Sequence, residues 1–122
     1  MKAIFTSTGP TLDSPVDGRF GRCAWFILAD TDTLQFEAFE NAAAAGSSGA
    51  GSQAAQFVID RGAAAVATGN VGPNAFAVLN AAGIAVHTGA AGTVRDALAA
   101  LKSGSLAHAA APTGPAHHGG RQ

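Results

Sequence analysis

The chain has 122 residues, a length that suits one domain with a single hydrophobic core and is too short for two. Its 7 basic and 8 acidic residues contain no basic cluster, which argues against nucleic acid as the main partner. No apolar run approaches the roughly 20 residues that span a bilayer, and the apolar stretch after Lys2 is too short for a secretory signal. We therefore expect a cytoplasmic protein with no membrane partner.

The first part of the chain predicts three strands. Residues 2–7 form a short apolar run that ends in hydroxyl residues, which is typical of a buried central strand. A loop rich in Gly, Pro and Asp follows over residues 8–22. Residues 24–29 and 34–40 flank a polar turn, and the second run alternates apolar with polar residues, which predicts a hairpin with a half-exposed second strand.

The second part predicts alternating helices and strands. Residues 42–51 contain only Ala, Gly and Ser, as in a flexible linker, and Ser52 is expected to cap a helix that ends at Arg61. The remaining elements are expected as strand 63–68, helix 73–82, strand 84–87 and helix 93–103. This alternation implies an α/β domain with parallel strands joined by right-handed crossovers. The domain is expected to cover residues 1–106, and residues 107–122, rich in Ala, Pro, Gly and His, to form a disordered tail.

Small-residue loops follow the predicted strands at the edge where a ligand would bind. In open α/β sheets the ligand crevice lies beyond the carboxyl ends of the strands, and residues 8–22, 69–72 and 88–92 occupy that position. Glycines let backbone N–H groups approach an anion, and the helix N-termini after Gly72 and Gly92 add partial positive charge. The alternative for each loop is tight packing between strand and helix without a ligand. Together the loops predict an anion cradle.

Nucleotide-binding and catalytic motifs fit this chain poorly. Residues 69–72 lack the third spaced glycine of a dinucleotide fingerprint, and no lysine follows to reach a terminal phosphate. His87 ends a predicted strand, where it is either a ligand or proton carrier or a histidine bonded to the backbone. Asp13 and Asp17 are more typical of side-chain turns than of acid–base catalysis. No base with an orienting partner can be named, so we do not expect an enzyme.

The only cysteine is Cys23, so there is neither a disulfide within the chain nor a set of thiolates for zinc or an iron–sulfur cluster. Cys23 either packs as a small hydrophobic side chain or, beside Arg19 and Arg22, has a lowered pKa and an exposed thiolate that contacts copper or is oxidised. The two arginines bracket Phe20 and Gly21 and suit a polyanionic ligand, although solvated loop arginines are the alternative.

Three motifs in order resemble a known family. They are Thr-Leu-Asp-Ser-Pro-Val-Asp-Gly-Arg-Phe-Gly-Arg-Cys at 11–23, Trp-Phe-Ile-Leu-Ala-Asp at 25–30 and Gly-Asn-Val-Gly-Pro-Asn-Ala-Phe at 69–76. The chain resembles the dinitrogenase iron-molybdenum cofactor biosynthesis family over residues 2–105. Many members have histidine where this chain has Arg19, and the arginine variant is more similar to the orange-protein branch. That branch implies a ribonuclease H-like α/β fold, a mixed five-stranded sheet with three helices, and a molybdenum-copper sulfide cluster held without covalent protein ligands.

The resemblance implies a protein that binds an anionic metal–sulfur cluster for storage, transfer or signalling. Such a cluster carries its own sulfides, so it needs cations and hydrogen-bond donors rather than thiolates. Three alternatives stay open: a carrier of an iron-molybdenum cofactor precursor, an adaptor for a P-loop ATPase, and a small-molecule enzyme that uses Cys23 or His87. Direct side-chain ligation of metal is not expected, with Cys23 and His87 as second-tier candidates. The expected binding residues, with Phe20 and Val71 as an apolar wall, are Arg19, Phe20, Gly21, Arg22, Gly69, Asn70, Val71, Gly72, Pro73, Asn74, Gly89, Ala90 and Gly92.

Overall fold

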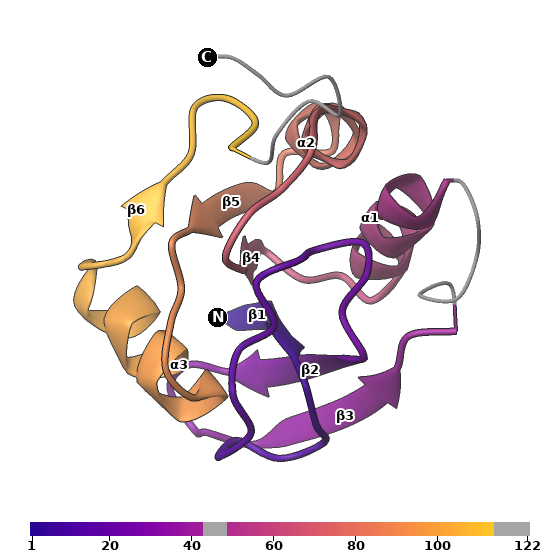
Figure 1. Cartoon of the computed structure of the whole chain (residues 1–122). Coiled ribbons are helices and arrows are strands. Elements are labelled where there is room, and N and C mark those ends of the chain that lie inside the picture. The colour runs from indigo at the N-terminus through magenta and orange to yellow at the C-terminus, as the bar shows by residue number, and fades with distance from the viewer. Residues whose placement is uncertain (43–48, 114–122) are drawn as a thin grey trace.

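A mixed sheet forms the centre of the molecule in a computed structural model that describes residues 1–42 and 49–113 (Figure 1). Its strand order is β3-β2-β1-β4-β5-β6. β1, β4 and β5 are parallel, whereas β2 and β3 at one edge and β6 at the other run antiparallel to their neighbours. This is the single-domain ribonuclease H-like arrangement that the resemblance implies. The elements are β1 (Lys2–Ser7), β2 (Trp25–Asp30), β3 (Phe36–Glu40), α1 (Ala50–Asp60), β4 (Ala65–Ala67), α2 (Pro73–Ala81), β5 (Ala85–Thr88), α3 (Val94–Ser103) and β6 (Ala107–His108).

The core lies in two layers, one on each face of the sheet. Successive side chains of a strand point to opposite faces, so Ile4 of β1 joins a cluster with the inner faces of α1 and α2. Its neighbours Ala3 and Phe5 join the second cluster, which α3 covers. Alanines dominate β4, where Ala65 and Ala67 are buried and bring α3 close to the sheet.

The start of α1 differs from the sequence-based prediction. The helix begins at Ala50 with Gly49 as its N-cap, so the prediction that Ser52 caps it is wrong, and Ser52 lies inside the first turn. Gly51, expected in the linker, is helical. A Cβ added at Gly21 would lie only 2.8 Å from the backbone of Gly51, so the absence of both side chains lets the first loop contact the helix. The rest of the predicted linker, residues 43–48, lies outside the described residues.

A sixth strand appears where the sequence predicts only a tail. β6 pairs with β5, and beyond it the N–H of Ala109 donates to the carbonyl of Val86 (2.8 Å) and the N–H of Thr113 to that of Val71 (3.0 Å). The sheet therefore has six strands rather than five. A physical reason is that the outer edge of β5 would otherwise present unpaired backbone groups. Residues 114–122 lie outside the described residues.

None of the helices within residues 1–42 and 49–113 combines the length and apolar character that crossing a bilayer requires.

Candidate functional site

The first loop is fastened across the carboxyl ends of β1 and β4. The N–H of Asp17 donates to the carbonyl of Thr6 (3.0 Å), and the N–H of Asn70 donates to that of Gly18 (2.8 Å). A Cβ added at Gly69 would lie 2.6 Å from the Cα of Gly18, so only glycine allows this approach. The loops thus gather at one edge of the sheet, as the sequence predicts, but they bond largely to one another.

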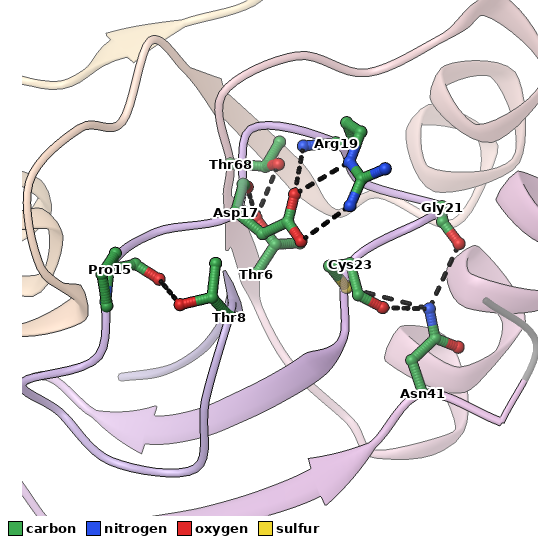
Figure 2. A network of polar contacts seen from close by, with 9 residues as sticks. All are labelled: Thr6, Thr8, Pro15, Asp17, Arg19, Gly21, Cys23, Asn41 and Thr68. Carbon is green, nitrogen blue, oxygen red and sulfur yellow. Dashed lines mark hydrogen bonds and ion pairs between the residues drawn. The ribbon is translucent and has the colours of Figure 1, made fainter.

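A buried carboxylate organises the turn of this loop (Figure 2). Asp17 is only 6% exposed, and its carboxylate accepts hydrogen bonds from the backbone N–H of Arg19 (3.1 Å), from its Nε (3.2 Å) and from its terminal guanidinium nitrogen (3.3 Å). The hydroxyl of Thr6 donates to the Asp17 carbonyl (2.6 Å) and lies 2.8 Å from the hydroxyl of Thr68. Hydrogen bonds and the opposite charge of Asp17 raise the pKa of Arg19. Asp17 therefore makes the expected side-chain turn and offsets the charge of Arg19.

A cavity of about 180 Å³ lies where the N-termini of α1 and α2 converge. Gly49 and Gly72 are the N-cap residues, no described side chain caps either helix, and neither first turn contains an acidic residue. First-turn N–H groups have no acceptor within their own helix, and each helix start carries partial positive charge. The cavity can therefore receive an anion from two helices at once. It is lined by Phe20, Gly21, Gly49, Gly51, Ser52, Gly72, Pro73, Asn74 and Ala75.

At the start of α3, in contrast, the backbone N–H groups already have hydrogen-bond acceptors. Thr93 and Asp96 form a capping box, each side chain accepting a hydrogen bond from the other's backbone N–H. The next N–H groups, of Val94 and Arg95, donate to the carbonyls of Ser14 (2.9 Å) and Leu12 (2.8 Å). The helix start that follows Gly92 therefore differs from that of α2, although both follow glycine-containing loops.

The predicted binding residues divide into two groups. Phe20, Gly21, Gly72, Pro73 and Asn74 line the cavity, and the exposed residues Arg19 and Arg22 flank Phe20 and Gly21 along the chain.

The other predicted residues lie outside the cavity lining: Gly69, Asn70, Val71, Gly89, Ala90 and Gly92. The N–H groups of Gly89 and Ala90 donate to the carbonyls of Gly69 (2.9 Å) and Thr68 (3.1 Å). Val71 is buried in the core and its N–H donates to the Thr113 hydroxyl (3.2 Å), so of the two expected apolar wall residues only Phe20 lines the cavity.

Sequence reasoning missed four cavity residues: Gly49, Gly51, Ser52 and Ala75. The sequence did offer one signal for the α1 part of the cavity, because Ser52 was predicted at the start of a helix. No local pattern indicates that α1 and α2 begin side by side, because this depends on the tertiary contact in which a Cβ on Gly51 would meet Ala75 at 3.4 Å.

Cys23 is a structural residue. It is fully buried, and the side-chain amide of Asn41 donates to its carbonyl (2.9 Å) and contacts its Sγ (3.8 Å). Burial, reinforced by the negative charge of Asp17, raises the pKa of the Cys23 thiol to about 12. Of the two alternatives, packing as a small hydrophobic side chain is therefore confirmed, and the lowered pKa with an exposed thiolate is wrong, because burial removes the sulfur from solvent and the Asp17 carboxylate raises the pKa further.

His87 lies half-buried on β5 with Nδ1 3.3 Å from the carbonyl oxygen of Leu106, which is the backbone-bonded arrangement rather than a side chain aimed at the cavity. Across residues 1–42 and 49–113, no group of three or more His, Cys, Asp or Glu side chains is placed to hold a metal ion. The cavity itself offers backbone hydrogen-bond donors and the partial positive charge of two helix starts.

Comparison with known proteins places the chain in a family. The family model described as dinitrogenase iron-molybdenum cofactor matches residues 1–104. The chain belongs to this family. Among solved structures it is similar to the apo form of the orange protein from Desulfovibrio gigas, with 42% identity, a TM-score of 0.89, and coverage of 93% of this chain and 96% of that one.

Two further proteins are similar to this chain over most of its length. A Thermotoga protein solved by NMR and named as a candidate NifB protein has 36% identity and a TM-score of 0.77, with 88% of this chain and 91% of that chain covered. An uncharacterized protein of Methanocaldococcus jannaschii is 26% identical over 100 residues, which cover 80% of this chain and 85% of the relative.

Proposed function

We propose that the protein binds, without covalent ligands, an anionic molybdenum-containing metal–sulfur cluster, with molybdenum-copper sulfide as the preferred cargo. The observation that carries this proposal is the convergence on one cavity of the N-termini of α1 and α2, which no side chain of the described residues caps. The family supports a cluster or cofactor as ligand, and the similarity to the apo form of the orange protein supports the orange-protein branch. We infer a binding role in storage, transfer or signalling rather than catalysis.

The chemistry of the site fits a cluster that brings its own sulfides. Cys23 remains a protonated thiol below its raised pKa of about 12 and is buried, so it is unsuited to be a thiolate ligand. Backbone N–H groups at two helix starts donate hydrogen bonds to anionic acceptors without the cost of ordering long side chains. The N–H groups of Asn74 and Ala75 on α2 and those of Ala50 to Ser52 on α1 are the donors that we assign to sulfide.

Two arginines lie beside the cavity residues Phe20 and Gly21 along the chain. Arg19 is paired with the buried Asp17, so the two groups together add little net positive charge. Arg22 follows the cavity residue Gly21 and is exposed, so it adds a second guanidinium to this loop. The electrostatic attraction therefore comes mainly from helix dipoles, with Arg22 as an additional cation.

The test is reconstitution of the full chain with tetrathiomolybdate and copper, followed by desalting, elemental analysis and visible spectroscopy. Retained molybdenum and copper with sulfide-to-metal charge-transfer bands are the expected result. Parallel incubation with an iron-molybdenum-sulfur precursor separates the two cargoes. A colourless, metal-free protein in both incubations would overturn cluster binding, and co-purification of a P-loop ATPase with that protein would favour the adaptor role.

The matched variants for this test are Ser52→Glu and Ser52→Gln. Ser52 is exposed at the cavity in the first turn of α1, so both longer side chains can be accommodated and only their charge differs. We expect Ser52→Glu to lose most of the cluster during desalting and Ser52→Gln to retain more of it. Equal retention by both variants would contradict the placement of an anion at the start of α1.

A further inference from the structure

Two histidines face each other across the last pair of strands. His87 on β5 and His108 on β6 are direct partners in the antiparallel register, so both side chains leave the same face of the sheet. Their ring centroids are 5.2 Å apart and the ring planes are inclined by 37°. Neither residue belongs to the cavity at α1 and α2, so this pair is independent of the proposed cluster site.

The backbone fixes which nitrogen of His87 is available. Nδ1 lies 3.3 Å from the carbonyl oxygen of Leu106, which can only accept a hydrogen bond, so Nδ1 carries the hydrogen. In the neutral imidazole the lone pair then lies on Nε2. A carbonyl that holds the second ring nitrogen is the usual arrangement behind a metal-ligating histidine, because it fixes both tautomer and ring orientation.

We propose that His87 and His108 form a two-imidazole site for a divalent transition-metal ion, with water completing the coordination. The ring spacing leaves room for a shared ion. A metal–nitrogen bond of about 2.0 Å, plus about 1.2 Å from nitrogen to ring centre, puts the ion about 3.2 Å from each centroid. Two such ligands at a tetrahedral angle have centroids about 5.2 Å apart, against about 4.5 Å at a right angle. The observed 5.2 Å matches the tetrahedral arrangement.

The surroundings define the kind of site. His108 is exposed and His87 half-buried, so an ion can enter from solvent. The described part of the chain supplies no third His, Cys, Asp or Glu to the pair, which leaves the remaining coordination positions to water or to an external donor. Imidazole ligands suit Cu²⁺, Ni²⁺ and Zn²⁺, and the general order of affinities places Cu²⁺ first. The site is therefore open and exchangeable rather than a closed structural centre.

Binding of an ion here joins β6 to β5. β6 has only two residues, and its pairing is extended by the hydrogen bond from Ala109 to Val86 (2.8 Å). An ion that bridges the two strands binds the folded protein better than the unfolded chain, so it raises the thermal midpoint. The thermal midpoint of unfolding therefore reports metal binding in the absence of any cluster and independently of the proposed function.

The experiment uses the full-length protein carrying His117→Ala and His118→Ala, which removes the two tail histidines outside the described residues. Cu²⁺, Ni²⁺ and Zn²⁺ are titrated separately, with stoichiometry from calorimetry, imidazole signals from NMR for Zn²⁺, and thermal midpoints for all three. We expect one ion per chain, perturbation of the His87 and His108 signals together, and a raised midpoint.

The matched variant is His108→Ala in the same background, which folds because His108 is exposed. It should weaken binding by roughly tenfold or more, since one of the two protein ligands is gone. Unchanged affinity in His108→Ala, or loss of all binding when only the tail histidines are replaced, would overturn the site.

Discussion

A single substitution at the start of α2 tests whether this helix start holds the anionic ligand. Gly72 is the N-cap at φ −77° and ψ 172°, the extended conformation that a capping side chain needs, and an added Cβ would meet nothing within 4 Å. Gly72→Asp and Gly72→Asn both supply a side-chain oxygen that can accept a hydrogen bond from the first-turn N–H groups. Only Gly72→Asp adds a negative charge. The two variants therefore differ in charge and hardly in shape.

Gly72→Asp is expected to raise the stability of the free protein and to lower its affinity for the cluster. Capping in place of glycine is worth a few tenths of a kcal/mol, and a carboxylate at the helix start adds about 0.3–1 kcal/mol, so Gly72→Asp should stabilise the free protein by about 1 kcal/mol. For binding, unit like charges about 5 Å apart repel by about 1–3 kcal/mol at effective dielectric constants of about 80 to 20. Each ligand charge then weakens cluster affinity by about 5- to 150-fold.

The assay is urea unfolding of the free protein together with cluster retention on desalting. Ala99→Asp, on an exposed position of α3, is the control because it changes the net charge equally away from the cavity. We expect Gly72→Asp to lose the cluster, Gly72→Asn to lose less, and Ala99→Asp to retain it. Equal retention by Gly72→Asp and Gly72→Asn would refute the assignment of α2 as an anion-binding helix.

The first loop, the buried thiol and the α3 cap each lead to a further prediction. Arg19→Ala leaves the buried Asp17 carboxylate without its guanidinium partner, so the midpoint of urea unfolding of this variant should fall. Adding Asp17→Asn to Arg19→Ala removes the unpaired charge and should restore the midpoint, and an unchanged midpoint in Arg19→Ala would contradict the pairing. With its pKa at about 12, against about 8.5 for a free thiol, Cys23 should react with iodoacetamide at pH 8 about 10³-fold more slowly than in urea, and equal rates would show an exposed thiolate. Hydrogen bonds from Thr93 lower the pKa of Asp96, so the ionised carboxylate stabilises the fold above about pH 4, and this stabilisation is lost as acid protonates Asp96. Between pH 5 and pH 3 the urea midpoint of Asp96→Asn should therefore fall less than that of the parent protein.

Local sequence patterns predicted the strands and helices because interactions between neighbouring residues determine where these elements begin and end. β1 was predicted as residues 2–7 and is Lys2–Ser7, since an apolar run that ends in hydroxyl residues is sufficient to mark a buried strand. Gly83 and Gly104 come directly after the helices predicted at residues 73–82 and 93–103, and their φ values of 78° and 80° are the left-handed conformation in which glycine ends a helix. These boundaries depend on a few neighbouring residues, and so sequence is enough.

The site was less predictable because its parts are distant in sequence. The sequence indicated glycine loops at one sheet edge, but it could not say which N–H groups the loops use among themselves. Gly89 and Gly69 bond to each other, and residues 12–14 close α3, through contacts that only the folded chain reveals. β6 was missed for a similar reason, since two residues of low complexity pair with β5 without any periodic pattern.

The contrast among the three helix starts is the strongest physical argument for a ligand at α1 and α2. α3 has a hydroxyl cap, an acidic residue in its first turn and two loop carbonyls, which together account for its free N–H groups. α1 and α2 begin at Gly49 and Gly72, where no side chain within residues 1–42 and 49–113 caps the helix and neither first turn contains an acidic residue. Serine or aspartate at position 72 would stabilise the free protein, and the open space around its Cβ would admit either residue. A carboxylate there would also occupy the position that we propose for an anionic ligand, so glycine at this position gives up the stability of a cap and, under the proposed function, leaves the donors to that ligand.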